Sequence, residues 1–165
     1  MLLIAVSLAI GLGFSATPTA LADYPFPAPD GSWSDVRVFL HGLPQEQGDA
    51  CYPFVIVRWI SGSMEEETAQ VTRLRETVGL ALGVYASKTQ EQAGILLAEL
   101  LDCLRRPLWK GRVLAGRFEL EEPVKAEIPT PRTRWNEYHL ATIETVWNYV
   151  WPSRGLEELT KMERP

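Results

Sequence analysis

The stretch Pro-Phe-Val-Ile-Val-Arg-Trp, residues 53–59, decides the fold that we predict for this chain. It is a short apolar run rich in β-branched residues, and it ends at Arg58 and Trp59. Such a run is typical of a strand that is buried on at least one face. We therefore expect residues 53–59 to form the central strand of one small sheet, which is a scaffold and carries no chemistry of its own.

Further strands are predicted where apolar and polar residues alternate along the chain. These stretches are residues 35–40, 71–86, 117–120, 124–128 and 138–151. From Val78 to Val84 every second residue is bulky, and Gly or Ala stands between the bulky residues. Because this pattern leaves one face of the strand nearly bare, we expect a helix to lie close to the backbone on that face.

One helix is predicted over residues 90–106. Thr89 and Gln92 form a capping-box pattern at its start, and Pro107 is expected to end it. Apolar residues recur at helical spacing, namely Ile95, Leu97, Leu100, Leu101, Leu104 and Leu108. This apolar stripe is the face that we expect to pack on the sheet.

The first 34 residues begin with an uncharged apolar run, residues 2–14, which is followed by a connection rich in proline. We expect the run to form a helix buried on more than one side, since it is apolar all round. Ala20-Leu21-Ala22 is similar to a signal-peptidase site, so a cleaved secretory signal is the alternative. The absence of Lys and Arg before the run disfavours that alternative, and the run is too short to span a bilayer.

Strands and helices are segregated along the chain rather than regularly alternating, which indicates an α+β fold. We expect a single, largely antiparallel β-sheet flanked by helices. This domain would span residues 35–152. It would follow the apolar helix and Pro-rich connection at residues 1–34, and a charged tail would follow it at residues 153–165.

Composition narrows the classes of function. The 165 residues include 16 Lys and Arg against 21 Asp and Glu, and the net charge of −5 disfavours a protein that reads nucleic-acid sequence. Cys51 and Cys103 are far apart and match no metal-binding spacing. His41 and His139 belong to no catalytic motif. We therefore expect no enzyme, no metal and no cofactor.

Two charged stretches are candidate interaction sites. The acidic one follows the 53–59 strand as a solvated loop or hairpin tip and consists of Glu65, Glu66 and Glu67. The basic one lies at the end of the predicted helix and includes Arg105, Arg106, Lys110 and Arg112. Either the helix dipole alone explains the basic stretch, or the stretch is a patch that meets an acidic partner or passing DNA. In the second case, subunits would pair acidic loop to basic patch, head to tail, as closed rings require.

Tryptophan is unusually frequent, with six residues in the chain. Trp33, Trp135 and Trp151 fall in predicted loops or at strand ends. They are candidates for an interface, where amphipathic rings are enriched. Ordinary packing in the core or at its rim is the alternative for all three.

Several of these features follow one another in a specific order. They are the PFVIVRW strand, the acidic loop, a strand that ends in Val84-Tyr85, the Leu-rich helix near RRPLW, the LAGRFELEEP segment, and a closing strand with Trp135, Thr142, Thr145 and Trp147 before Pro152. This order resembles that in the tail-terminator or tail-completion proteins of long-tailed bacteriophages and prophages. The resemblance covers residues 35–152. Related proteins tend to begin with an amphipathic helix that bears charges, so the uncharged 2–14 run departs from the pattern.

The resemblance implies a structural virion protein without catalytic residues. Such proteins form a ring, commonly hexameric, which caps the tail tube, stops its polymerisation and joins the tail to the head connector. The implied partners are further copies of the chain, the tail tube protein and the head-tail connector or stopper protein. Residues 65–67 and 129–135 would contact neighbours or the tube.

The ring would assemble in the host cytoplasm and stay in the virion, with DNA passing through its lumen and no membrane involved. A head-tail connector or stopper protein is the close alternative. An exported bacterial binding protein cleaved after Ala22 is an alternative of another class.

Overall fold

The computed structural model describes residues 25–43, 51–68, 71–87, 90–110, 112–114, 118–129 and 137–152. Most of these residues form one six-stranded sheet in the order β3-β4-β5-β8-β7-β6. Its strands are β3 (Arg37–Leu40), β4 (Phe54–Thr68), β5 (Val71–Tyr85), β8 (Tyr138–Pro152), β7 (Phe118–Glu127) and β6 (Val113–Leu114). Neighbouring strands are antiparallel except β3 and β4, which are parallel, so the sheet is mixed.

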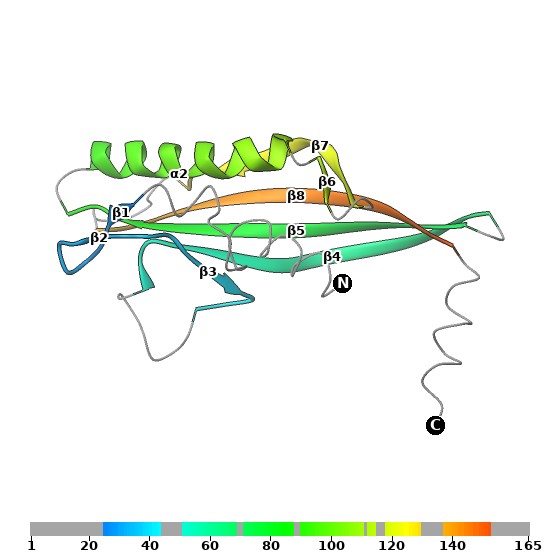
Figure 1. Cartoon of the computed structure of the whole chain (residues 1–165), viewed down its shortest axis with the longest axis horizontal. Coiled ribbons are helices and arrows are strands. Elements are labelled where there is room, and N and C mark those ends of the chain that lie inside the picture. Colours follow the sequence, from blue (N-terminus) through cyan, green and yellow to red (C-terminus); the bar gives the residue numbers. More distant parts are fainter. Residues whose placement is uncertain are drawn as a thin grey trace, which may run out of the picture.

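A second sheet and a helix complete the described structure. The second sheet is an antiparallel pair of β1 (Phe26–Pro27) and β2 (Trp33–Ser34). The helix α2 (Gln90–Lys110) lies along one face of the large sheet (Figure 1). Among the described residues, no helix is both long and apolar enough to cross a membrane.

The expected fold class, a single largely antiparallel sheet flanked by helices, is wrong. The described residues are mostly β, with one helix, a mixed large sheet and a separate small sheet. Strand length is the main reason, because β4, β5 and β8 each run for 15 residues. The 2–14 segment, which we expected to supply a second helix, lies outside the described residues.

Strand β4 runs beyond the predicted 53–59 stretch and continues through Ser61-Gly62-Ser63. Residues 61–63 pair with residues 75–77 of β5, after a shift in register between Trp59 and Ser61. Glycine is a poor strand former on its own. The ladder to β5 therefore carries β4 through this stretch, and the shift in register absorbs the irregularity.

The core lies between α2 and one face of the large sheet. Val78, Leu80, Leu82 and Val84 of β5 are buried there, as is every second residue of β8 from Ala141 to Tyr149. The helix contributes Ala93, Leu96, Leu97, Leu100, Leu101, Leu104 and Leu108 to the same cluster. This confirms the predicted helical stripe except at Ile95, which is 54% exposed.

The helix does not end at Pro107 but continues to Lys110. Pro107 has no N–H, so α2 lacks the one backbone hydrogen bond that residue 107 would have donated to the carbonyl of Cys103. The additional turn buries Leu108, which is only 5% exposed. Burial of this side chain against the sheet offsets the loss caused by the proline.

The helix packs on the bulky face of β5, not on the glycine face as expected. Gly79 and Gly83 lie on the opposite face, where side chains of β4 cover them. A Cβ atom at Gly83 would lie 2.4 Å from Cε1 of Phe54, and one at Gly79 would lie 2.8 Å from Cδ1 of Ile60. The glycines therefore make room for large side chains of the neighbouring strand, not for a helix.

Candidate protein interaction site

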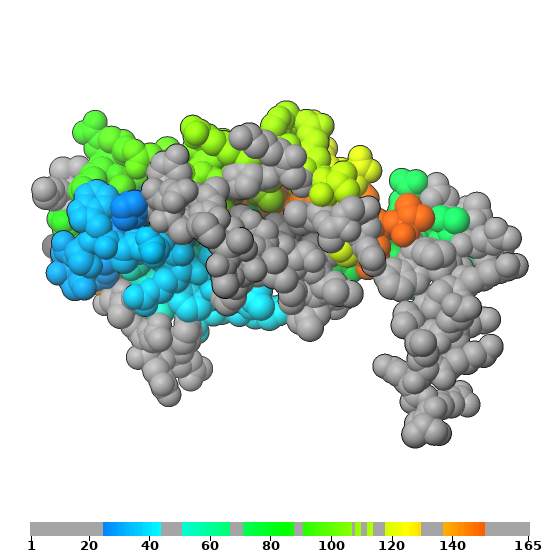
Figure 2. Space-filling view, viewed as in Figure 1, coloured from blue at the N-terminus to red at the C-terminus, as the bar shows by residue number. Residues whose placement is uncertain are grey.

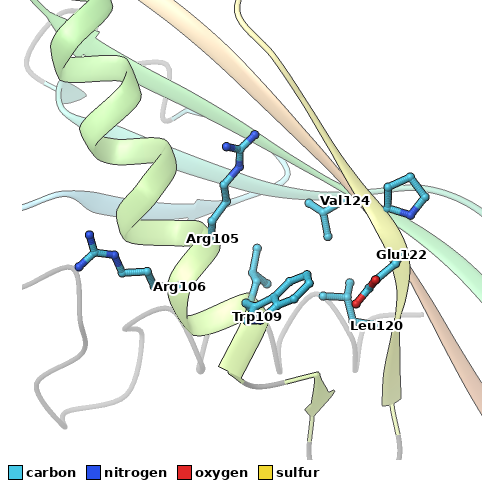
Figure 3. A pocket seen from close by; sticks show the side chains of 8 residues that line it. Arg105, Arg106, Trp109, Leu120, Glu122 and Val124 are labelled. Atoms are coloured by element: carbon cyan, nitrogen blue, oxygen red, sulfur yellow. The ribbon is translucent and has the colours of Figure 1, made fainter.

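A mainly apolar groove lies where the last turn of α2 faces strand β7 (Figure 3). Its cavity has a volume of about 470 Å³. The lining residues are Arg105, Arg106, Leu108, Trp109, Leu120, Glu122, Pro123 and Val124. A cavity of several hundred Å³ is typical of binding sites in proteins.

The local sequence explains both walls of the groove. On α2, Leu108 completes the buried stripe, whereas Trp109 is turned by about 100° around the helix and is 59% exposed. On β7, the register with β8 is interrupted between Glu121 and Lys125. Pro123 lies in this interruption and has no N–H to donate to the ladder. The groove therefore forms where the helical stripe ends and the ladder between β7 and β8 is interrupted.

The rim of the groove is basic. The guanidinium of Arg112 lies over the ring of Trp109, 4.2 Å from its centroid. Nη2 of Arg112 is also 2.5 Å from Oε1 of Glu122 on β7. Arg106 forms an ion pair with Asp102, one turn earlier on α2. These ion pairs are exposed and contribute little to stability. They nevertheless hold the guanidinium groups of two arginines beside an apolar surface.

Arg105 is the cation of the groove with no ion pair to another described residue. It is exposed, and a guanidinium can donate two parallel hydrogen bonds to one carboxylate. Apolar walls beside such a cation suit a partner that presents an apolar side chain next to a carboxylate. Trp and Arg are also the residue types that most often dominate the binding energy of protein interfaces.

A second surface lies at the far end of the sheet, where β4, β5 and β8 extend beyond α2 (Figure 1). We define this arm as residues 63–68, 71–75 and 148–152. In the space-filling view, green atoms of the β4–β5 hairpin and orange atoms of β8 lie together on the right side of the molecule (Figure 2). On the arm, Met64 is 67% exposed and Val150 is 55% exposed. Glu65 and Glu66 are exposed as well.

The two glutamates of the arm leave opposite faces of the sheet, because they are consecutive residues of β4. Glu66 shares its face with Met64, two residues earlier. This face is the α2 side of the sheet, because Leu74, the β5 partner of Met64, pairs in turn with the buried Tyr149. The arm thus presents an exposed methionine and an exposed carboxylate on the same side.

The structure separates the acidic and basic residues that we expected at interfaces. Arg105, Arg106 and Arg112 meet at the groove. Glu65 and Glu66 lie on the arm, in β4 close to the end of the β4–β5 hairpin, and not in a loop. Among the described residues of one chain, no ion pair joins the two sets.

The other residues expected at interfaces add less to the site. Trp33 lies in β2 of the small sheet and is 67% exposed. Glu67 belongs to β4, Trp151 to β8 and Lys110 to the end of α2, but their side chains are not among those described. Trp135 lies outside the described residues.

Sequence reasoning missed Trp109 as a site residue. Trp109 directly follows the last buried leucine of the helical stripe, so its position off the stripe was a usable signal. Leu120 and Val124 gave no such signal, because they belong to a strand that meets the end of α2 only in the folded chain.

The described residues include no group of three His, Cys, Asp or Glu side chains that could hold a metal ion. Neither Cys51 nor Cys103 forms a disulfide bond. Burial raises the pKa of the Cys103 thiol, which disfavours the reactive thiolate form.

Comparisons with known proteins assign no family. The chain matches no protein-family model and no curated protein. The groove and the arm are therefore the observations from which a function can be inferred, together with the order of sequence features described above.

Proposed function

We propose that the chain is the subunit of a ring that caps the tail tube of a long-tailed bacteriophage or prophage. The ring would end polymerisation of the tube and join the tail to the head connector. The observation that supports this proposal most is that one chain has two unlike interaction surfaces, the arm and the groove. Contacts between unlike surfaces of identical subunits form a ring when the rotation between neighbours closes.

The composition of both surfaces supports assembly. The groove is lined by both Trp109 and Arg105, and the guanidinium of Arg112 lies over the Trp109 ring; Trp and Arg are frequent at the centre of interfaces. The arm exposes Met64 and Val150 at a projecting end of the sheet. Single exposed apolar residues are ordinary on protein surfaces. Met64 and Val150, however, both lie on the part of the sheet that α2 does not cover (Figure 1).

The assignment to a phage tail depends on the resemblance of residues 35–152 to tail-terminator proteins. By that resemblance the ring is hexameric and contacts the tail tube protein and the head connector. A net charge of −5 agrees with a ring that lets DNA pass without holding it.

Electron microscopy of particles made without this protein tests the proposal. Loss of a terminator should give overlong tails that are not attached to heads. Tails of normal length without heads would instead assign the chain to the head-tail connector or stopper. Complete virions with normal tails would contradict both assignments.

The ring itself is tested by the mass of the purified protein over a range of concentrations. We expect an oligomer in solution and the same chain in purified tails. A strictly monomeric protein that is absent from tails would contradict the proposal. N-terminal sequencing of the natural protein is a further check, because a start at Asp23 would favour an exported binding protein.

A further inference from the structure

The arm presents an apolar side chain and a carboxylate, which are the groups that would complement the groove. The groove offers apolar walls around Trp109 and the guanidinium of Arg105, which has no ion pair with another described residue. Its occupant should therefore present an apolar side chain and a carboxylate on one side. Met64 and Glu66 meet this requirement, because they are exposed and lie two residues apart on the same face of β4.

We infer that the groove of one subunit receives the arm of a second copy, with Met64 against Trp109 and the carboxylate of Glu66 facing Arg105. The inference rests on the proposed function and names the partner of the groove. It also explains why the exposed Trp109 and the exposed Met64 lie on different parts of the same chain.

Glu66 fits this contact better than its neighbour Glu65. Glu65 lies opposite Arg73 of β5, so a cation of its own sheet is already near it. Glu66 lies opposite Thr72 and makes no ion pair with another described residue. Its carboxylate is therefore the one that gains most from a guanidinium supplied by a partner.

A second copy, not the same chain, must supply the arm. Met64 is held in register with Leu74 of β5, and β5 is paired with β8 from Val71 to Tyr85. The arm cannot fold back onto α2 of its own subunit without breaking these ladders, and unpaired backbone groups are costly. The arm extends past α2 (Figure 1), and its residues Met64 and Glu66 are exposed, so a neighbour can reach them.

Residues 153–165 offer a competing occupant with similar chemistry. In this segment Leu156 and Leu159 flank Glu157 and Glu158. The arm is favoured because Met64 and Glu66 lie on a strand that is already ordered by its ladder, so little conformational entropy is lost on binding.

Charge reversal in the full-length chain tests the contact. Glu66→Lys and Arg105→Glu should each weaken self-association by about tenfold, because each change replaces an attraction by a repulsion. The double variant E66K/R105E should recover most of the wild-type association, since opposite charges again face each other. Analytical ultracentrifugation measures the association, and circular dichroism checks that each variant is folded. Glu91→Lys, an exposed change at the other end of α2, is the control and should associate like the wild type.

Mixing two variants tests the direction of the contact. Met64→Asp should inactivate the arm, and Trp109→Ala should inactivate the groove, so neither variant should assemble alone. A mixture of the two should form a one-to-one dimer and nothing larger. The intact arm of the Trp109→Ala chain fits the intact groove of the Met64→Asp chain, and no second contact of this kind remains.

Three outcomes would overturn the inference. Assembly of Glu66→Lys and Arg105→Glu at wild-type strength would show that arm and groove do not meet, although the proposed ring would stand. Loss of assembly in E157K/E158K but not in Glu66→Lys would assign the groove to residues 153–165. A strictly monomeric wild-type chain would overturn the proposed ring and this contact with it.

Discussion

Arg75 of β5 and Glu121 of β7 form a two-point ion pair across the intervening strand β8. Nε and Nη2 of Arg75 donate hydrogen bonds to Oε2 and Oε1 of Glu121, both at 2.8 Å. Asn148 of β8 donates Nδ2–H to Oε2 of the same carboxylate at 3.1 Å. The hydrogen bonds from Arg75, and then that from Asn148, lower the pKa of Glu121 from 4.5 to about 2. Three strands are thus joined by side chains where the arm begins.

Glu121→Gln should destabilise the protein near neutral pH and change its response to acid. The pKa of Glu121 is lower in the folded chain, so between about 2 and 4.5 the unfolded chain binds more protons and wild-type stability rises with pH. The contribution is complete above pH 4.5 and is lost as pH falls toward 2. It should be modest, because both side chains of the ion pair are partly exposed.

Urea unfolding of the wild type and Glu121→Gln at several pH values measures this effect. The difference in unfolding free energy should shrink as the solution is acidified. Glu127→Gln, an exposed change on the same strand, should show no such trend. A difference between wild type and Glu121→Gln that stays constant at every pH would contradict the assigned role of the ion pair.

Leu100→Ala should lower the free energy of unfolding by about 3 kcal/mol, because it leaves a cavity in a packed core. Leu100 is fully buried between α2 and the sheet. Ile95→Ala is the matched control on the same helix and should have little effect, since Ile95 is 54% exposed. Chemical denaturation measures the free energy of unfolding of both variants. Equal losses would mean that the two faces of α2 are equally packed, contrary to the structure.

The periodicity of apolar residues within one segment predicts whether that segment is a helix or a strand. It does not predict how the helix and strands are arranged. Burial of Leu100 and Leu104 follows the helical period, and burial of β8 from Ala141 to Tyr149 follows the strand period. Both patterns are properties of a single segment. The length of β4 is not, because residues 61–63 are held in the strand by their partners on β5.

The groove is only half predictable for the same reason. The basic stretch around Arg105 is evident from composition alone. Leu120 and Val124 complete the groove from β7, and no local pattern pairs them with the end of α2. The glycines of β5 show the same limit. Periodicity reveals the bare face, but only the fold shows that Phe54 of β4 covers it.

Gly83→Ala should destabilise the protein by about 1–3 kcal/mol, because the added methyl overpacks a closed site. Its Cβ would lie 2.4 Å from Cε1 of Phe54. The Phe54 ring is buried and packs edge-on against Tyr52, so it has little room to move. Thermal unfolding measures this loss of stability as a decrease in the melting temperature.

Gly94→Ala is the matched control and should have the opposite sign. Gly94 lies on the exposed side of α2, and a Cβ there would meet no atom within 4 Å. Alanine in a helix should therefore stabilise the protein by about 1 kcal/mol relative to glycine. A neutral Gly83→Ala would mean that Phe54 can shift, and the proposed reason for the glycine face would be wrong.

Thr145→Val should lower the free energy of unfolding by about 1–3 kcal/mol, because it leaves a buried donor unsatisfied. The hydroxyl of Thr145, which is fully buried, donates to the carbonyl of Val78 at 2.9 Å. It also accepts a hydrogen bond from the indole N–H of Trp147 at 2.9 Å. Valine is nearly isosteric with threonine, so the loss reports the hydrogen bonds rather than a cavity. Chemical denaturation measures this change in the free energy of unfolding.

A double-mutant cycle with Trp147→Phe isolates the bond between the two side chains. Phenylalanine has no N–H, so in that background Thr145→Val leaves no indole donor without an acceptor. The cost of Thr145→Val should then be smaller by about 1 kcal/mol, and the cavity made by Trp147→Phe cancels in the cycle. Equal costs of Thr145→Val in both backgrounds would mean that the hydroxyl does not hold the indole. The burial of Trp147 at the base of the arm would then depend on packing alone.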